Sequence, residues 1–320
     1  MRMFASLKQI MAIGLLLALA VPVTTGDAAS KTQADFITDD GRDLRALADR
    51  ETRALLQPAR GVGASFGEKQ HQRYCRLKGS DAPVQWVVNN LETGDVIARS
   101  ANAQQLYFGA SVSKLFVAAA FLDKHGGAFT QQQLRELVKM IVVSDNPAWK
   151  SLQRQTGGDG SDYAGRVAVQ AFVERMGYPT IQGFQGWMKH GNGTREHGNE
   201  LNALELSRFL HDTHKRKYHG SDVLWQIMRA TRTGRNKINK YTPDHLHIGG
   251  KTGTYSGPNE SKETVRLPTI GARNHAVVLF TENGPFGISV LSNTASSEDV
   301  AILGGGLMRE YLGVTPVIAC

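Results

Sequence analysis

The sequence has 320 residues, with 37 Lys and Arg against 29 Asp and Glu, which gives a formal charge of +8. Hydrophobic residues make up 41% and charged residues 21%, proportions that exclude a disordered chain and a fibrous repeat. The length suits two domains of average size or one large domain. The positive charge is compatible with an anionic partner, such as a cell-wall polymer, a membrane surface or nucleic acid, but it does not choose among them.

The first thirty residues have the pattern of a secretory signal peptide. Arg2 and Lys8 precede an apolar stretch from Ile10 to Val23, and the small residues of Asp27-Ala28-Ala29-Ser30 follow. This apolar stretch is too short for a stable membrane span. We therefore expect residues 1–29 to be removed. The expected product is a secreted or periplasmic protein without a transmembrane anchor.

Local patterns predict a helix and a hairpin at the start of the remaining chain. Leucines and alanines in residues 30–58 recur near helical spacing, and Gly61-Val62-Gly63 ends that pattern. Residues 84–88 and 96–98 are rich in β-branched and aromatic side chains, and Glu92-Thr93-Gly94-Asp95 between them has turn chemistry. These residues predict a β-hairpin.

The middle of the chain is predicted to be entirely helical. Apolar residues recur at helical spacing throughout, and Gly126-Gly127 interrupts the first pattern. The predicted helices cover residues 111–123, 132–143, 147–155, 164–176, 203–214 and 222–231.

Strand patterns return only near the end. Residues 247–251, 276–281 and 286–291 are predicted strands, the last two joined through Asn283-Gly284, and a helix over 297–312 follows. This order predicts an α+β fold in which one five-stranded antiparallel sheet is assembled from both ends of the chain. The sheet would be flanked by N- and C-terminal helices. The single domain 30–320 would comprise an α/β lobe (30–105 and 241–320) and an inserted all-helical lobe (106–240).

Three short motifs carry the chemistry: Ser111-Val112-Ser113-Lys114, Ser144-Asp145-Asn146 and Lys251-Thr252-Gly253-Thr254. Ser111 and Lys114 are three residues apart and would share one helical face. A serine hydroxyl needs an adjacent base to act as a nucleophile. A lysine can be that base if burial and neighbouring cations lower its pKa enough to leave it neutral. Lys251 on a strand edge could provide such a cation and bind a substrate carboxylate.

These motifs, in this order and context, resemble those of the serine β-lactamase and penicillin-binding protein superfamily. The class A β-lactamase-like branch is the most similar. Asn90-Leu91-Glu92-Thr93-Gly94, the segment from Arg232 to Ile238 and Leu291-Ser292-Asn293 also fit that branch. The resemblance covers nearly all of the chain after residue 29, and it implies a β-lactamase/transpeptidase-like fold.

The resemblance also implies a role for each motif residue. Ser111 would be the acylated nucleophile, Lys114 its activating partner, and Ser144 the relay of a proton to the leaving nitrogen. Asn146 would contact the substrate side chain. Lys251, Thr252, Gly253 and Thr254 form the motif that would bind the substrate carboxylate. The backbone N–H groups of Ser111 and Thr254 would form the oxyanion hole.

Two departures from the class A pattern affect the expected activity. Only 33 residues separate Ser111 from Ser144, which predicts a trimmed helical lobe. The deacylating Glu of class A enzymes should follow Met176-Gly177 closely, but residues 183–190 (GFQGWMKH) contain no acid. Glu196 and Glu200 lie later and are interpreted as acids that precede the helix starting near Ala203.

The expected function is an exported serine hydrolase that forms an acyl-enzyme with β-lactams or with D-Ala-D-Ala-type amides of peptidoglycan stem peptides. Hydrolysis of the acyl-enzyme needs its own positioned base. Without the class A Glu, slow deacylation or D,D-peptidase activity is favoured. One alternative is a catalytically idle binding or sensor domain, against which the three intact motifs argue. Another is an esterase of related fold, which commonly has a tyrosine motif in place of Ser-Asp-Asn.

Other residues suggest binding sites without defining one. His211, His214, His219, His245 and His247 lack the spacing of a metal site, so we expect neither a metal nor an organic cofactor. The basic runs 215–217 and 229–240 fit either an anionic polymer or a solvated face. Trp149 and Trp187 fit either the core or a substrate wall. Nothing resembles a nucleic-acid-binding module.

Cys75 and Cys320, the only cysteines, are compatible with a disulfide or with two free thiols. The sequence does not determine the oligomeric state.

Overall fold

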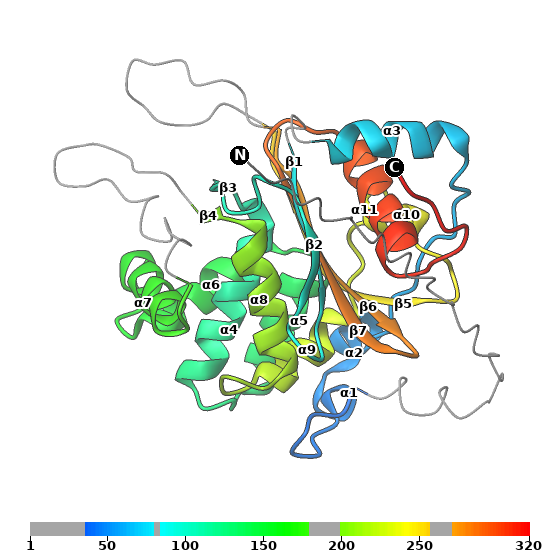
Figure 1. Cartoon of the computed structure of the whole chain (residues 1–320). Coiled ribbons are helices and arrows are strands. Elements are labelled where there is room, and N and C mark those ends of the chain that lie inside the picture. Colours follow the sequence, from blue (N-terminus) through cyan, green and yellow to red (C-terminus); the bar gives the residue numbers. More distant parts are fainter. Residues whose placement is uncertain (1–35, 80–83, 179–198, 257–270) are drawn as a thin grey trace, which may run out of the picture. The chain divides into compact units, whose positions relative to one another are not determined.

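The computed structural model describes residues 36–79, 84–178, 199–256 and 271–320 (Figure 1). The predicted signal peptide at residues 1–29 lies outside the described residues, as do Trp187, Glu196 and the segment 183–190. In the described part, no helix has both the length and the apolar character needed to cross a bilayer.

A five-stranded antiparallel sheet forms the centre of the fold. Its strand order is β2-β1-β7-β6-β5, so strands from both ends of the sequence pair in the middle of the sheet. β1 pairs with β7 from Val84 opposite Ser292 to Asn90 opposite Phe286. The predicted fold class is confirmed. The strands are β1 (Val84–Asn90), β2 (Val96–Arg99), β5 (His247–Thr254), β6 (Arg273–Thr281) and β7 (Gly284–Ser292).

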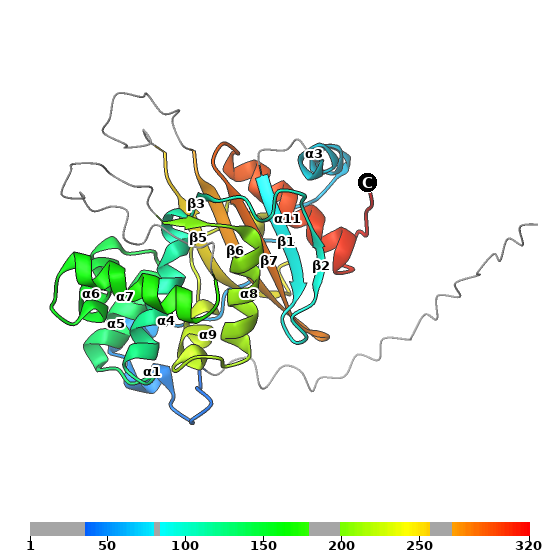
Figure 2. The same ribbon diagram turned by 60° about the vertical axis from the view of Figure 1, so that its left-hand side comes forward.

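Helices cover both faces of this sheet (Figures 1 and 2). Successive side chains of a strand point to opposite faces, and β6 follows this rule. Val277 and Leu279 pack in the core beneath α11 (Ser297–Tyr311). Ala276 and Val278 pack in the core of the helical lobe. The sheet therefore separates two hydrophobic cores.

The helical lobe closely follows the sequence prediction. Its helix starts are fixed by local hydrogen bonds, such as the capping box of Thr130 and Gln133 and the bond from the Ala148 amide to Asp145. The helices are α4 (Lys114–Lys124), α5 (Gln131–Val142), α6 (Asn146–Gly157), α7 (Asp162–Arg175), α8 (Ala203–His214) and α9 (Ser221–Met228).

The N-terminal segment differs from its prediction. The amphipathic run in residues 30–58 forms two short helices, α1 (Leu44–Leu47) and α2 (Arg50–Leu55). Asp43 and Asp49 each accept hydrogen bonds from the backbone that follows, so each starts a helix of its own. Four other short elements were not predicted: α10 (Ile238–Tyr241), the 3-10 helix η2 (Ala110–Ser113), and the paired strands β3 (Tyr107–Phe108) and β4 (Glu200–Leu201).

The helix α3 (Glu68–Lys78) was also missed, because its sequence has almost no apolar stripe. Tyr74 is its one buried residue, and the Tyr74 hydroxyl donates to Glu310 at 2.5 Å. A Cβ atom on Gly306 of α11 would lie 2.2 Å from the Tyr74 ring. The glycine in α11 therefore provides the close contact that holds α3, which a search for hydrophobic periodicity does not detect.

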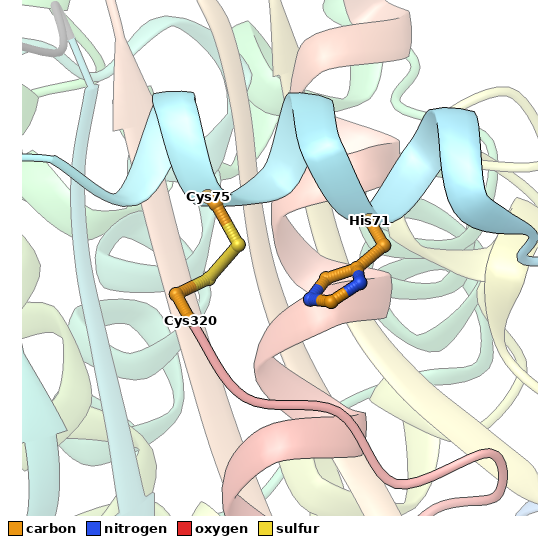
Figure 3. A group of neighbouring side chains, drawn as sticks. All are labelled: His71, Cys75 and Cys320. Carbon is orange, nitrogen blue, oxygen red and sulfur yellow. A yellow bond between two sulfur atoms is a disulfide. The ribbon is translucent and has the colours of Figure 1, made fainter.

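A disulfide joins Cys75 of α3 to Cys320, with 5.5 Å between the two Cα atoms. Figure 3 shows the bridge beside His71, whose ring contacts the backbone oxygen of Ala319 at 2.9 Å. The structure thus selects the disulfide over two free thiols. Because 245 residues separate the cysteines in sequence, the bridge strongly restricts the unfolded chain.

We expect reduction of this disulfide to lower the free energy of unfolding by about 3 kcal/mol. The physical reason is the conformational freedom that the unfolded chain regains. Urea denaturation with and without a reductant measures the difference, and the Cys75→Ser/Cys320→Ser variant serves as the control because reductant should not change its transition. Identical transitions for the oxidised and reduced wild-type protein would contradict the prediction.

Candidate active site

Ser111 lies in a tight turn at the start of a buried helix. The turn is η2, Ala110–Ser113, and α4 begins at Lys114, so the predicted α-helix from Ser111 starts instead with a 3-10 turn. Residues i and i+3 eclipse one another in a 3-10 helix, which places Ser111 and Lys114 on one side. Ala110 has a φ of 46°, a left-handed conformation unusual for a residue other than glycine. Backbone strain of this kind is often found at functional sites.

The Ser144 hydroxyl lies between two lysines. Lys251 Nζ donates to Ser144 Oγ at 2.8 Å, and Lys114 Nζ lies 3.4 Å from the same oxygen. Ser144 itself is held at a φ of 65°. A hydroxyl has one proton to donate and two lone pairs with which to accept. The two lysines donate toward the lone pairs of Ser144 Oγ, so the hydroxyl proton remains available for donation to a third group.

Lys114 is buried and held by neutral oxygens. Its Nζ donates to the Ser144 carbonyl and to Asn146 Oδ1, both at 2.6 Å. Burial lowers the pKa of Lys114 from 10.5 to about 8, and the negative charge of Asp145 opposes part of this change. Lys114 can therefore lose its proton close to neutral pH, as a general base must.

Lys251 is fully buried at the edge of the sheet. It lies on β5, an outer strand, and its Nζ also donates to the Thr252 carbonyl at 2.8 Å. Burial, followed by the charges of Lys114 and Lys237, lowers the pKa of Lys251 well below its usual value. An opposite charge nearby raises the pKa of a lysine, so an anionic substrate group that entered here would favour the charged form of Lys251.

The backbones of β5 and η2 touch at Gly253. A Cβ atom at this position would lie 2.7 Å from the Gly109 carbonyl, 3.1 Å from Val112 N and 3.2 Å from Ser111 N. Only glycine permits this approach. Thr252, beside it, is buried, and Thr254 is exposed. The packing brings the third motif directly to the nucleophile turn, where backbone N–H groups of both segments could bind an oxyanion.

Lys237 is a site residue that the sequence analysis did not single out. Its Nζ donates to the Gly253 carbonyl at 2.6 Å, to Thr254 Oγ1 at 2.8 Å and to the Asn274 carbonyl at 3.1 Å. Burial, followed by the charge of Arg273, lowers its pKa from 10.5 to about 7. The signal was its place in the segment Arg232–Ile238, which fits the class A β-lactamase-like branch, although no role was assigned to Lys237 there.

Asn274, on β6, was also missed. Its Nδ2 donates to the carbonyls of Phe108 and Gly109 at 2.8 and 3.0 Å, and its Oδ1 accepts from Ser292 N at 2.9 Å. One side chain thus ties the nucleophile turn to two strands of the sheet. No short motif marks such a residue, because its partners are distant in sequence. The carbonyls that accept from Nδ2 are more than 160 residues away, and the amide that donates to Oδ1 is 18 residues away.

Trp149 of α6 lies on the Lys114 side of the site. The Lys114 ammonium is 5.8 Å from the centre of the Trp149 ring, and the Arg166 guanidinium of α7 is 5.9 Å from the same centre. Trp149 also packs against the core of the helical lobe. It therefore serves as both core and site wall, the two possibilities that the sequence left open.

The Lys114 backbone N–H donates to the Ser111 carbonyl, but among the described residues no hydrogen bond joins the Ser111 hydroxyl to the Lys114 ammonium. In this structure the Lys114 ammonium is directed to Ser144 and Asn146. Glu200 lies in β4, paired through its backbone with Phe108, immediately before α8. This agrees with the interpretation of Glu200 as an acid that precedes the helix beginning at Ala203.

Two of the histidines considered as metal ligands have other contacts. His211 Nδ1 lies 2.9 Å from the Leu91 carbonyl, and His214 Nε2 lies 2.8 Å from Glu92 Oε2. Over the ranges that the structure covers, one group has the ligand types and closeness of a metal site: His71, Cys75 and Cys320. Both sulfur atoms of that group are already joined in the disulfide.

Comparison with known protein families matches residues 125–304 to the model of the β-lactamase enzyme family. The match covers more than half of the chain. Comparison with curated protein sequences gives no significant match.

Solved structures of class A β-lactamases and other β-lactamases share the fold. A class A β-lactamase from Bacteroides cellulosilyticus is 22% identical with a TM-score of 0.54, over 73% of this chain and 94% of that one. A β-lactamase from Chitinophaga pinensis is 19% identical with a TM-score of 0.55, over 74% and 96%. One from Streptosporangium roseum is 17% identical with a TM-score of 0.57, over 77% and 99%. At these identities the likeness concerns the fold. Together with the family match, it establishes that this chain belongs to the β-lactamase enzyme family.

Proposed function

We propose that the protein is an exported serine hydrolase that forms an acyl-enzyme at Ser111 with β-lactams or with D-Ala-D-Ala-type amides of peptidoglycan stem peptides. The observation that carries the proposal is the Ser144 hydroxyl held between Lys114 and Lys251 beside the nucleophile turn. Family membership supports a serine-hydrolase-like enzyme of this kind.

In the proposed reaction, neutral Lys114 takes the proton of the Ser111 hydroxyl, and Ser111 Oγ attacks the amide carbon. The negative oxygen of the tetrahedral intermediate would be bound by backbone N–H groups of Ser111 and Thr254. Ser144 then gives its proton to the leaving nitrogen as the C–N bond breaks, and it recovers a proton from a neighbouring lysine. Lys251, with Thr252 and Thr254, would bind the substrate carboxylate, and Asn146 the substrate side chain.

We further propose that water attacks the acyl-enzyme slowly. Activation of that water needs a base of its own. On the side of Lys114 that faces α6, the Lys114 ammonium lies over the Trp149 ring, and Arg166 contacts the same ring; neither side chain can accept a proton from water. Residues 183–190, where the sequence analysis looked for the class A acid, contain none. These features favour D,D-peptidase-like or penicillin-binding behaviour over rapid β-lactam turnover.

Labelled penicillin and intact-mass spectrometry test this proposal directly. The wild-type protein should gain the mass of one penicillin and hold it for minutes, whereas Ser111→Ala should gain none. Ser113→Ala is the matched control, because Ser113 lies in the same turn but donates to the Ala110 carbonyl at 2.6 Å; it should still be labelled. Lack of wild-type labelling would favour an idle binding domain, and rapid drug turnover would refute slow deacylation.

Asp145→Asn should shift the pH dependence of acylation to lower pH. Acylation needs neutral Lys114, whose pKa of about 8 means that the rate should rise as the pH increases toward 8. Asp145 raises that pKa, so removal of its charge favours the neutral amine. We expect acylation at pH 6.5 to become about threefold faster.

The asparagine can still cap α6 through Ala148 N, so folding should be preserved. Stopped-flow acylation from pH 5.5 to 9 makes the measurement. Asp159→Asn, beyond the far end of α6, is the control and should leave the profile unchanged. An unchanged or upward-shifted profile for Asp145→Asn would count against Lys114 as the base.

Gly253→Ala should slow acylation at least about 100-fold, because the added methyl group would separate β5 from the nucleophile turn. The same variant should lose stability, so acylation is to be compared under conditions where both proteins are folded by circular dichroism. Gly271→Ala is the control, since its Cβ would meet only ordinary contacts at 3.7 Å. Normal acylation by Gly253→Ala would show that this close approach is dispensable.

A further inference from the structure

A cavity of about 530 Å³ lies apart from the catalytic motifs. One wall is the segment 59–62 and the other is formed by Thr231, Arg232, Arg235 and Asn239. None of the catalytic or substrate-binding residues described above lines it. The volume lies within the usual range for small-molecule sites.

Backbone hydrogen bonds fix the two walls of this cavity. Val62 N donates to the Asn239 carbonyl at 2.8 Å, and Ala59 N donates to the Arg229 carbonyl at 2.8 Å. A Cβ atom on Gly61 would lie 2.2 Å from the Pro243 carbonyl, so this wall also depends on a close backbone approach. The cavity is therefore built into the fold and is not a gap between loose loops.

The cavity carries three arginines, Arg60, Arg232 and Arg235. Among the described residues, none of them forms a salt bridge with a carboxylate. Arg232 donates to the Ala54 carbonyl, which leaves its charge unneutralised. Burial, followed by the charges of Arg60 and Arg229, lowers the pKa of the neighbouring His247. The lining is thus positively charged, and guanidinium groups bind carboxylate and phosphate oxygens well.

Asn239 lies on the same wall and is 3% exposed. Its Oδ1 has almost no accessible surface, so it does not face the cavity. The three arginines therefore set the chemistry of the lining.

We propose that this cavity binds a small anion that carries carboxylate or phosphate groups. Arg60, Arg232 and Arg235 bind the anionic oxygens. The site is separate from the acylation chemistry at Ser111. It gives the basic run 229–240 a specific role in place of a merely solvated face.

Isothermal titration at low salt with citrate, which has three carboxylates, tests the site. Citrate should bind saturably to the wild-type protein. Arg60→Gln/Arg235→Gln should weaken citrate binding at least about tenfold. Arg99→Gln, an exposed arginine on β2 at the opposite edge of the sheet, is the control and should bind normally.

The arginine variant also distinguishes this cavity from the lysines of the active site, which could attract the same probes. Citrate binding that is equally strong in Arg60→Gln/Arg235→Gln, or absent in the wild type up to about 10 mM, would overturn the proposal. Glucuronate and glucose 6-phosphate, compared on the same protein, then tell carboxylate from phosphate as the preferred anion.

Discussion

Three buried lysines near one strand edge are the constraint on which this site depends. Lys114, Lys237 and Lys251 are all at most 2% exposed, and among the described residues none forms a salt bridge with a carboxylate. Buried charges without a paired ion are costly. The protein supplies neutral oxygens instead, including the carbonyls of Ser144 and Thr252 and the Asn146 amide. Neutral acceptors do not raise the lysine pKa values as a paired carboxylate would, so the pKa values of all three lysines stay lowered by burial. The approach of an anionic group would favour their charged forms.

The burial of these lysines is accompanied by unusual backbone conformations and close backbone contacts around the site. The backbone oxygens that hold these lysines come mainly from the edge strand β5 and from the loop at Ser144, and the Asn274 carbonyl of the inner strand β6 also accepts from Lys237. On β5, the Gly253 and Thr252 carbonyls accept from Lys237 and Lys251. Gly253 also lets β5 approach the nucleophile turn. The left-handed conformation of Ser144 places both its carbonyl and its hydroxyl near Lys114. The strained backbone at Ser144 therefore provides the oxygens that hold the buried Lys114.

The sequence was sufficient for the sheet and the helical lobe, because their apolar periodicities and turn residues are local signals. It was insufficient where packing depends on distant partners. The helix α3 has one buried side chain and is held by a glycine of α11 more than 200 residues away. The same limit applies to the site. The residues that the sequence identified lie in recognisable motifs: Ser111, Lys114, Ser144 and Lys251. Asn274 and Lys237 act through long-range hydrogen bonds to backbone carbonyls, for which no short sequence pattern exists.

The structure also shows where part of the positive charge lies in a chain whose formal charge is +8. The segment 231–239 contributes to two separate concentrations of positive charge. Lys237 is buried inward against Gly253 and Thr254, and Arg232 and Arg235 line the cavity with Arg60. A merely solvated basic run would have no reason to bury a lysine. The part of the sequence that seemed least specific therefore contributes both to the substrate-binding strand and to the proposed anion site.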